Sequence, residues 1–231
     1  MNVSTARLGQ GAGIASAVAG AIYVAVQVKH PAMTVESATT ADWMVRNTAK
    51  TVMSALVLAG ITGMYLRQHA KTGLFGLIGY LTLSAGFLMM FATTFMAAFA
   101  LPTTARLDPS WTGDVIAAAF KGSANGDIGA LTTVFAVTGG FYILGGLLFG
   151  VTTFRAGVLN RWAAALLAVG NVATAALAVL PQSFNRPLAV PTGLALIGLG
   201  VSLWNDQRKA TATNTAAVAA TGHAEPAVSV R

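Results

Sequence analysis

The chain has 231 residues, of which 55% are hydrophobic and 9% charged, with a mean hydropathy of +0.67. An ordinary soluble domain carries roughly 25% charged residues, so this chain is too poor in charge to cover a soluble globule and is expected to lie in lipid. Its net charge of +7 is scattered singly, which argues against a nucleic-acid partner, and the lack of cysteine excludes disulfides and thiol catalysis.

Six apolar segments follow one another along the chain, and each approaches the roughly 20 residues that a helix needs to cross a bilayer. They are Leu8–Val28, Asn47–Leu66, Leu74–Leu101, Ile128–Thr152, Arg161–Leu180 and Pro187–Trp204. Helices are expected because an isolated span must satisfy its own backbone hydrogen bonds in lipid, and the alternating strands of a barrel are not seen. The sequence therefore predicts an all-α, multi-pass bundle of six transmembrane helices over residues 1–205.

The ends of the chain differ from these segments. Arg7 precedes the first segment, but no small-residue cleavage site follows it, so this segment is predicted to be an uncleaved signal anchor. Residues 206–231 are rich in Ala and Thr with few large apolar side chains, which predicts a disordered cytoplasmic tail.

Orientation follows from the positive charges between the segments. With the N-terminus inside, the short inner turns are purely basic, whereas the long outer loops also hold five of the seven acids. Eight basic residues fall inside and six outside. The prediction is a bacterial plasma-membrane protein with both termini in the cytoplasm.

The outer loop from Pro102 to Asp127 contains apolar residues at helical spacing, beginning after Asp108 or Ser110. Either side chain can cap a helix, because its oxygen accepts backbone N–H groups that lack a partner. The segment is too short to span, so it is predicted to lie at the outer interface with Trp111 and Phe120 in the headgroups. Asp127 is expected to cap the next helix.

Ionisable side chains are missing near the middle of every segment, which argues against a proton-coupled pump, a haem b protein and a retinal protein. No cofactor is predicted. The candidate intramembrane polar residues are Asn171 and Tyr142. A hydrogen bond from Asn171 to a neighbouring helix is favoured over a substrate contact.

A second candidate site lies on the outer face, where polar residues and the loop tryptophans collect. It comprises His30, Asp42, Trp43, Trp111, Asp114 and Asp127. One histidine with scattered carboxylates is a weak metal or acid–base pattern, so helix capping and solvation are favoured and no metal is predicted.

Small residues predict close helix packing. Gly9 with Gly13 and Gly146 with Gly150 form G-x-x-x-G pairs, for which packing within the chain is favoured over dimerisation. A protein partner or a homo-oligomer stays open.

Three stretches carry a family resemblance: Thr62 to Gln68 (TGMYLRQ), Thr72 to Tyr80 (TGLFGLIGY) and Gly145 to Trp162 (GGLLFGVTTFRAGVLNRW). With them the chain resembles an uncharacterised six-helix integral membrane protein family of actinobacteria and related bacteria. The resemblance covers most of residues 8–204 and implies the six-helix fold. It implies no activity.

Three functional hypotheses remain open. The first is a structural, accessory or regulatory protein of the cell envelope, favoured because no buried chemistry is visible. The second is a transporter or binder of a neutral or apolar small molecule, with its cavity near Asn171 and Tyr142. The third and least favoured is a membrane enzyme at the outer surface, which would need His30 and the outer acids to converge.

Overall fold

The computed structural model describes residues 4–178 and 185–222, and within these ranges the chain is helical and contains no strand. The helices are α1 (Thr5–Ala25), α2 (Val35–Ala38), α3 (Ala41–Phe99), α4 (Leu101–Leu107), α5 (Pro109–Lys121), α6 (Leu131–Ala156), α7 (Arg161–Ala173), the 3₁₀ helix η1 (Thr174–Ala178) and α8 (Asn185–Gly222). Four stretches are long and apolar enough to cross a membrane: α1, α3, α6 and residues 186–213 of α8. The predicted all-α membrane fold is therefore confirmed at this level.

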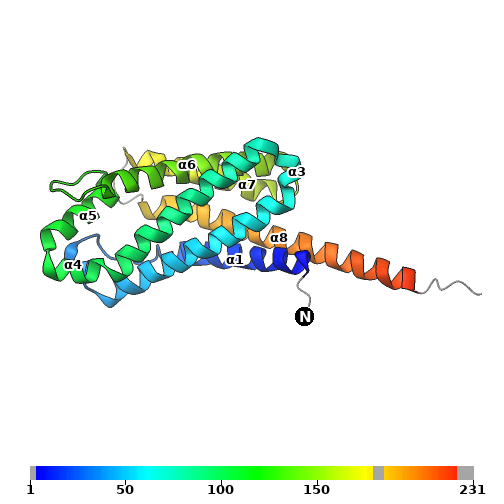
Figure 1. Cartoon of the computed structure of the whole chain (residues 1–231), viewed down its shortest axis with the longest axis horizontal. Helices are drawn as coiled ribbons and strands as arrows, with labels where there is room; N and C mark the ends of the chain where they lie inside the picture. The colour runs from blue at the N-terminus through cyan, green and yellow to red at the C-terminus, as the bar shows by residue number, and fades with distance from the viewer. Residues whose placement is uncertain (1–3, 179–184, 223–231) are drawn as a thin grey trace, which may run out of the picture.

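Helix α3 is 59 residues long because it consists of two arms that fold back on each other at Gly73. Gly73 has φ 56° and ψ −151°, values that a helix cannot hold and that glycine adopts readily. The arms lie antiparallel, as Figure 1 shows. Side chains join them along their length, with Thr51 to Thr94 at 3.1 Å and Thr62 to Tyr80 at 3.0 Å.

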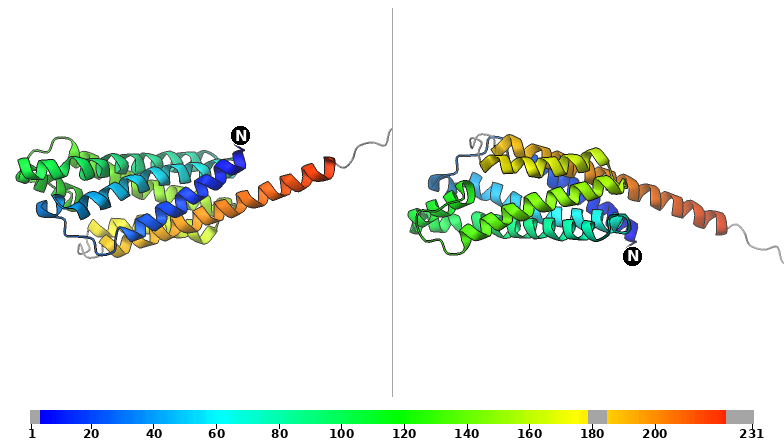
Figure 2. Two further views of the ribbon diagram at one scale, coloured as in Figure 1. Left: turned by 90° about the horizontal axis from the view of Figure 1, so that it is seen from below. Right: turned by 90° about the horizontal axis from the view of Figure 1, so that it is seen from above.

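The bundle has two distinct ends, visible in Figures 1 and 2. The Gly73 end holds the turn of α3 and, through the hydrogen bond of 2.7 Å from Gln68 to Thr153, the end of α6. Gly157, with φ 62°, ends α6 there. The α5 end holds α2, α4 and α5, which cover the tips of the longer helices.

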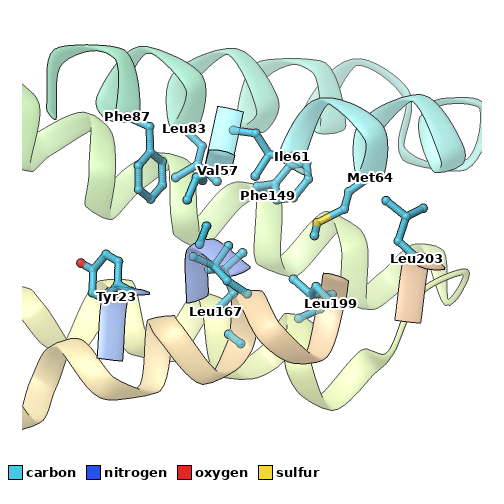
Figure 3. Packing of buried hydrophobic residues seen from close by; sticks show 14 of the residues in the cluster. Tyr23, Val57, Ile61, Met64, Leu83, Phe87, Phe149, Leu167, Leu199 and Leu203 are labelled. Atoms are coloured by element: carbon cyan, nitrogen blue, oxygen red, sulfur yellow. The ribbon is translucent and has the colours of Figure 1, made fainter. Parts of the chain in front are cut away.

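The middle of the bundle is a close-packed core. Its buried side chains come from every long helix and include Val57, Phe87, Phe149, Leu167 and Leu199 (Figure 3). Glycines bring the helix backbones together: a Cβ on Gly200 of α8 would lie 2.5 Å from the carbonyl oxygen of Gly13 in α1. Both predicted G-x-x-x-G pairs face neighbours within the chain.

The predicted helix after Asp108 is present as α5, and the Asp108 carboxylate accepts the backbone N–H of Trp111 at 2.9 Å. Its apolar face, however, packs on the tips of the other helices, where Val115 and Ile116 are buried against Trp43 and Leu101. Trp111 and Phe120 lie partly buried against this second core. The short helix is thus a cover on the bundle, because α4 turns it back over the arms of α3.

Several element boundaries differ from the sequence prediction. The second segment begins at Ala41 instead of Asn47, and the last helix continues to Gly222, through part of the stretch predicted to be a disordered tail. Ala-rich sequence favours helix, and Asp206 is held by Arg67 of α3 at the start of this extension. Figure 2 shows α8 running beyond the other helices. Residues 179–180 of the predicted fifth segment and 223–231 of the tail lie outside the described residues.

Candidate cationic cavity at the α5 end

The acids of the predicted outer-face site are engaged separately. Asp42 forms an ion pair with Arg46, whose Nε lies 2.9 Å from Asp42 Oδ1. Asp114 accepts the backbone N–H groups of Asn125 and Gly126 at 2.9 and 3.2 Å. Asp42 thus stabilises the first turns of α3 and Asp114 stabilises the segment after α5, and neither carboxylate contacts His30.

The remaining members also have local roles. Asp127 accepts the N–H of Gly129 at 2.8 Å and so stabilises the turn before α6, whose N-cap is Ala130 without a side-chain cap. The buried Trp43 donates its indole N–H to the carbonyl oxygen of Ala97 at 2.7 Å, which closes the open end of the α3 hairpin. Among the described residues, no three His, Asp or Glu side chains come close enough to hold a metal ion.

His30 lies among cations. Its Nε2 is 3.0 Å from Lys50 Nζ, and its Nδ1 is 3.0 Å from Arg186 Nη2 and 3.0 Å from the carbonyl oxygen of Pro31. Arg46 lies nearby and donates to the carbonyl oxygens of residues 26, 28 and 29. The structure thus replaces the predicted histidine–carboxylate group with a histidine bridging a lysine and an arginine.

The charge state of His30 follows from these neighbours. Burial, reinforced by Lys50, Arg186 and Arg46 and opposed by the hydrogen bond with Pro31, lowers its pKa from 6.5 to about 4. The imidazole is therefore neutral at physiological pH, with one ring nitrogen donating and the other accepting.

Only one tautomer suits most of these contacts. With the proton on Nδ1, His30 donates to Pro31 and accepts from the Lys50 ammonium at Nε2. Arg186 then faces an N–H group and is left with a long contact of 3.5 Å to Gln27 Oε1. With the proton on Nε2, an N–H group would face the Lys50 ammonium, and the lone pair of Nδ1 would face the carbonyl oxygen of Pro31. Among the described residues, the guanidinium of Arg186 therefore has more N–H donors than acceptors within reach.

Lys50 and Arg186 line a cavity of about 370 Å³ at the α5 end. Its walls come from α1, both arms of α3, α4, α5, α6, η1 and α8. Most lining residues are apolar, among them Met33, Met53, Met90, Val115 and Phe135. The charged side chains in the lining are Lys50 and Arg186, and its other polar side chains include those of Gln27, Asn47, Thr93, Thr94, Thr138 and Thr174. Amphipathic lining of this kind is typical of small-molecule sites.

No carboxylate pairs with either cation in the described parts of the chain, where the ion pairs are Arg46 with Asp42 and Arg67 with Asp206. Segment 179–184 contains no acidic residue either. Two partly buried cations on either side of one imidazole ring repel each other and lose hydration. The cavity therefore carries uncompensated positive charge, which a bound anion would neutralise.

Lys50 and Arg186 were among the six basic residues that the sequence placed on the outer side, and neither was predicted to be a site residue. The available signal was the spacing of Arg46 and Lys50, which puts two basic residues on one face at the start of a helix. Their convergence with Arg186 and His30 depends on the packing of α1, α3 and α8.

The candidate intramembrane residues Asn171 and Tyr142 form a closed network in the bundle. Asn171 donates to the carbonyl oxygen of Tyr142 at 2.9 Å and accepts from Thr192 at 3.1 Å. Tyr142 in turn donates to Thr192 at 3.1 Å, so Tyr23, 3.0 Å away, must donate to Tyr142. Asn171 thus joins α6, α7 and α8 by hydrogen bonds.

No protein-family model, curated protein or solved structure matches this chain.

Proposed function

We propose that this protein is a membrane-embedded binding protein for an amphipathic anion, held in the cavity at the α5 end. The observation that carries the proposal is the pair of cations, Lys50 and Arg186, which lie on either side of the neutral His30 at 3.0 Å each. Neither has a carboxylate partner among the residues that the structure describes. The oxygens of a carboxylate or phosphate there would accept from both groups, and charged hydrogen bonds of this kind are strong.

The rest of the lining supports an amphipathic ligand rather than a bare ion. An inorganic ion would leave the apolar walls around Met53, Met90 and Phe135 unfilled. The cavity does not continue through the bundle, since the core below it, with Val57 and Phe87 fully buried, is packed. This favours binding over a channel. An outer-surface enzyme is less well supported, because the outer acids are engaged elsewhere.

The proposed membrane arrangement has six crossings, with the α5 end outside and both termini in the cytoplasm. Support comes from the fold-back of α3 at Gly73, which gives two antiparallel arms, and from α7 with η1, which return the chain from the Gly73 end. The Gly73 end carries the basic residues of the short turns, as the positive-inside rule requires. A reporter enzyme that is active only outside the cytoplasm, fused to the C-terminus, is expected to be inactive. Activity would overturn this orientation.

The test of binding uses the full chain purified in neutral detergent, with a tritiated long-chain carboxylate and a tritiated long-chain monoalkyl phosphate as separate probes. Lys50→Met and Arg186→Gln are each expected to weaken binding of the preferred probe at least tenfold, since a charged hydrogen bond contributes roughly 1.5–3 kcal/mol.

The matched controls remove the same charges from the same end. Lys29 and Arg106 are exposed and do not line the cavity. Lys29→Met and Arg106→Gln should therefore bind as the unmodified chain does. Equal losses in controls and site variants would show nonspecific attraction, and binding of neither probe would overturn the proposal.

A further inference from the structure

The apolar part of the cavity is lined by unusually adaptable side chains. Four of the eight methionines in the chain line it: Met33, Met53, Met90 and Met96. Methionine is unbranched and flexible, and it packs against apolar groups of varied shape. Such walls suit a flexible chain better than a rigid ring system.

The cavity has a floor toward the middle of the bundle. The deepest lining residues are Tyr23 of α1, Met53 and Met90 of the two α3 arms, and Gly139 of α6. Below Tyr23, its hydroxyl bonds with that of Tyr142 at 3.0 Å, and the Tyr142 ring packs edge-on against Phe87 at 5.8 Å between centroids. Figure 3 shows Tyr23 and Phe87 at one edge of the packed core.

The length and volume of the cavity suit a single alkyl or acyl chain. From Trp43 to Met53 the lining of α3 extends about 15 Å along the helix axis. That is half of a hydrocarbon core roughly 30 Å thick, hence one leaflet. The volume of about 370 Å³ lies near the lower limit of small-molecule sites.

On the α6 side, the cavity is lined by a glycine, Gly139, which has no side chain to fill the space. A Cβ built on Gly139 would meet nothing within 4 Å, although Gly139 lines the cavity. Gly140, the next residue, also has nothing within 4 Å, but it is exposed and does not line the cavity. The two glycines therefore form a matched pair, one facing the space that a chain would fill and the other facing away.

We propose that the ligand is a single-chain amphiphile, one unbranched alkyl or acyl chain on a carboxylate or phosphate group, whose length is limited by the floor at Tyr23, Met53 and Met90. This rests on the proposed anion site: Lys50 and Arg186 hold the charged group, and the methionine-lined space holds the chain. Gly139 leaves the width that the chain needs.

The test measures the affinity of straight-chain carboxylates and monoalkyl phosphates of increasing length for the full chain in neutral detergent. Each buried methylene should tighten binding about fourfold until the chain reaches the floor, after which affinity stops rising. The series that binds more tightly identifies the headgroup. A two-chain phosphatidic acid should bind at least tenfold more weakly than its one-chain lyso form, and equal binding of the two would overturn the single-chain proposal.

Three variants locate the chain. Gly139→Leu should weaken long-chain binding at least tenfold, while Gly140→Leu should leave it unchanged. Met53→Ala should move the limiting length to longer chains, a gain that a damaged fold would not produce. Affinity that rises without limit, or equal behaviour of the two leucine variants, would overturn the chain assignment.

The two proposals fail differently. If short and long anions bind equally, and Lys50→Met still abolishes binding, the anion site stands and the single-chain ligand is wrong. If no anion of either series binds, the proposed function itself is wrong.

Discussion

Helix α6 passes through two regions of the molecule, and its glycines contact a neighbouring helix in one and face open space in the other. In the middle of the bundle, a Cβ on Gly145 would overlap the backbone of Leu83 in α3. Less than two turns away, Gly139 faces open space in the cavity. The same residue type thus permits close helix contact in one region and leaves room in the other. The comparison supports the proposal that the open end is a binding site, because two cations without a carboxylate partner in the described residues lie at the same end.

The polar groups repeat this contrast. Around Asn171 each polar side-chain atom has a hydrogen-bond partner within the bundle. Around His30, by contrast, two cations share one neutral imidazole, and in the described part of the chain the acceptor left to the Arg186 side chain is Gln27 Oε1 at 3.5 Å. A closed network stabilises the bundle, whereas an open one costs stability unless a ligand completes it.

The largest expected effect comes from closing the glycine contact. Gly145→Ala should lower the free energy of unfolding by about 2 kcal/mol, because the added methyl group collides with backbone that cannot move aside. Gly139→Ala should leave it unchanged or raise it by up to about 1 kcal/mol through helix propensity. Thermal unfolding in detergent measures both, and equal losses at the two positions would contradict the contrast.

A smaller loss is expected from the closed polar network. Asn171→Leu removes two hydrogen bonds between helices and should cost about 1 kcal/mol, since such bonds average roughly 0.6 kcal/mol each in membranes. Thr152→Val is the control, because the Thr152 hydroxyl bonds only carbonyls of its own helix. Similar unfolding free energies for the two variants would show that Asn171 does not link the helices.

The sequence predicted the local features of the molecule but not the site at the α5 end. Hydropathy predicted the helices, and Asp108 predicted the start of α5, because both signals are local. Lys50 was counted among the basic residues of the outer side because it lies only three residues after Asn47, the expected start of the second segment. The helix begins at Ala41, so Lys50 lies more than two turns inside it and in the cavity wall. Its site depends on residues distant in sequence, Arg186 above all.

For the cations around His30, the expected change in the free energy of unfolding has the opposite sign. Lys50→Met should raise the free energy of unfolding of the ligand-free protein by about 0.5–1 kcal/mol, because it removes repulsion with Arg186 and Arg46 while keeping the side chain's apolar length. The same variant should lose anion binding. Lys29→Met, with its side chain exposed, should change neither quantity. A clear loss of stability in Lys50→Met would show that the lysine is structural.

The smallest expected effect is a pH dependence. The pKa of His30 is held at about 4, below its ordinary 6.5, so the unfolded chain takes up this proton first as pH falls. The contribution to stability is complete above pH 6.5 and is lost as pH falls from 6.5 through 4. It is small because His30 is only partly buried and solvent screens its neighbours.

Thermal unfolding of the ligand-free protein across this pH range measures that loss. His30→Gln should flatten the slope, and His69→Gln, at the Gly73 end, should not. A bound anion should flatten it in part, because the pKa of His30 is lowered by burial and also by Lys50 and Arg186, whose positive charge the anion offsets. If ligand leaves the slope unaltered while His30→Gln removes it, the anion does not lie beside His30, and the contrast between the closed and the open polar groups loses its functional meaning.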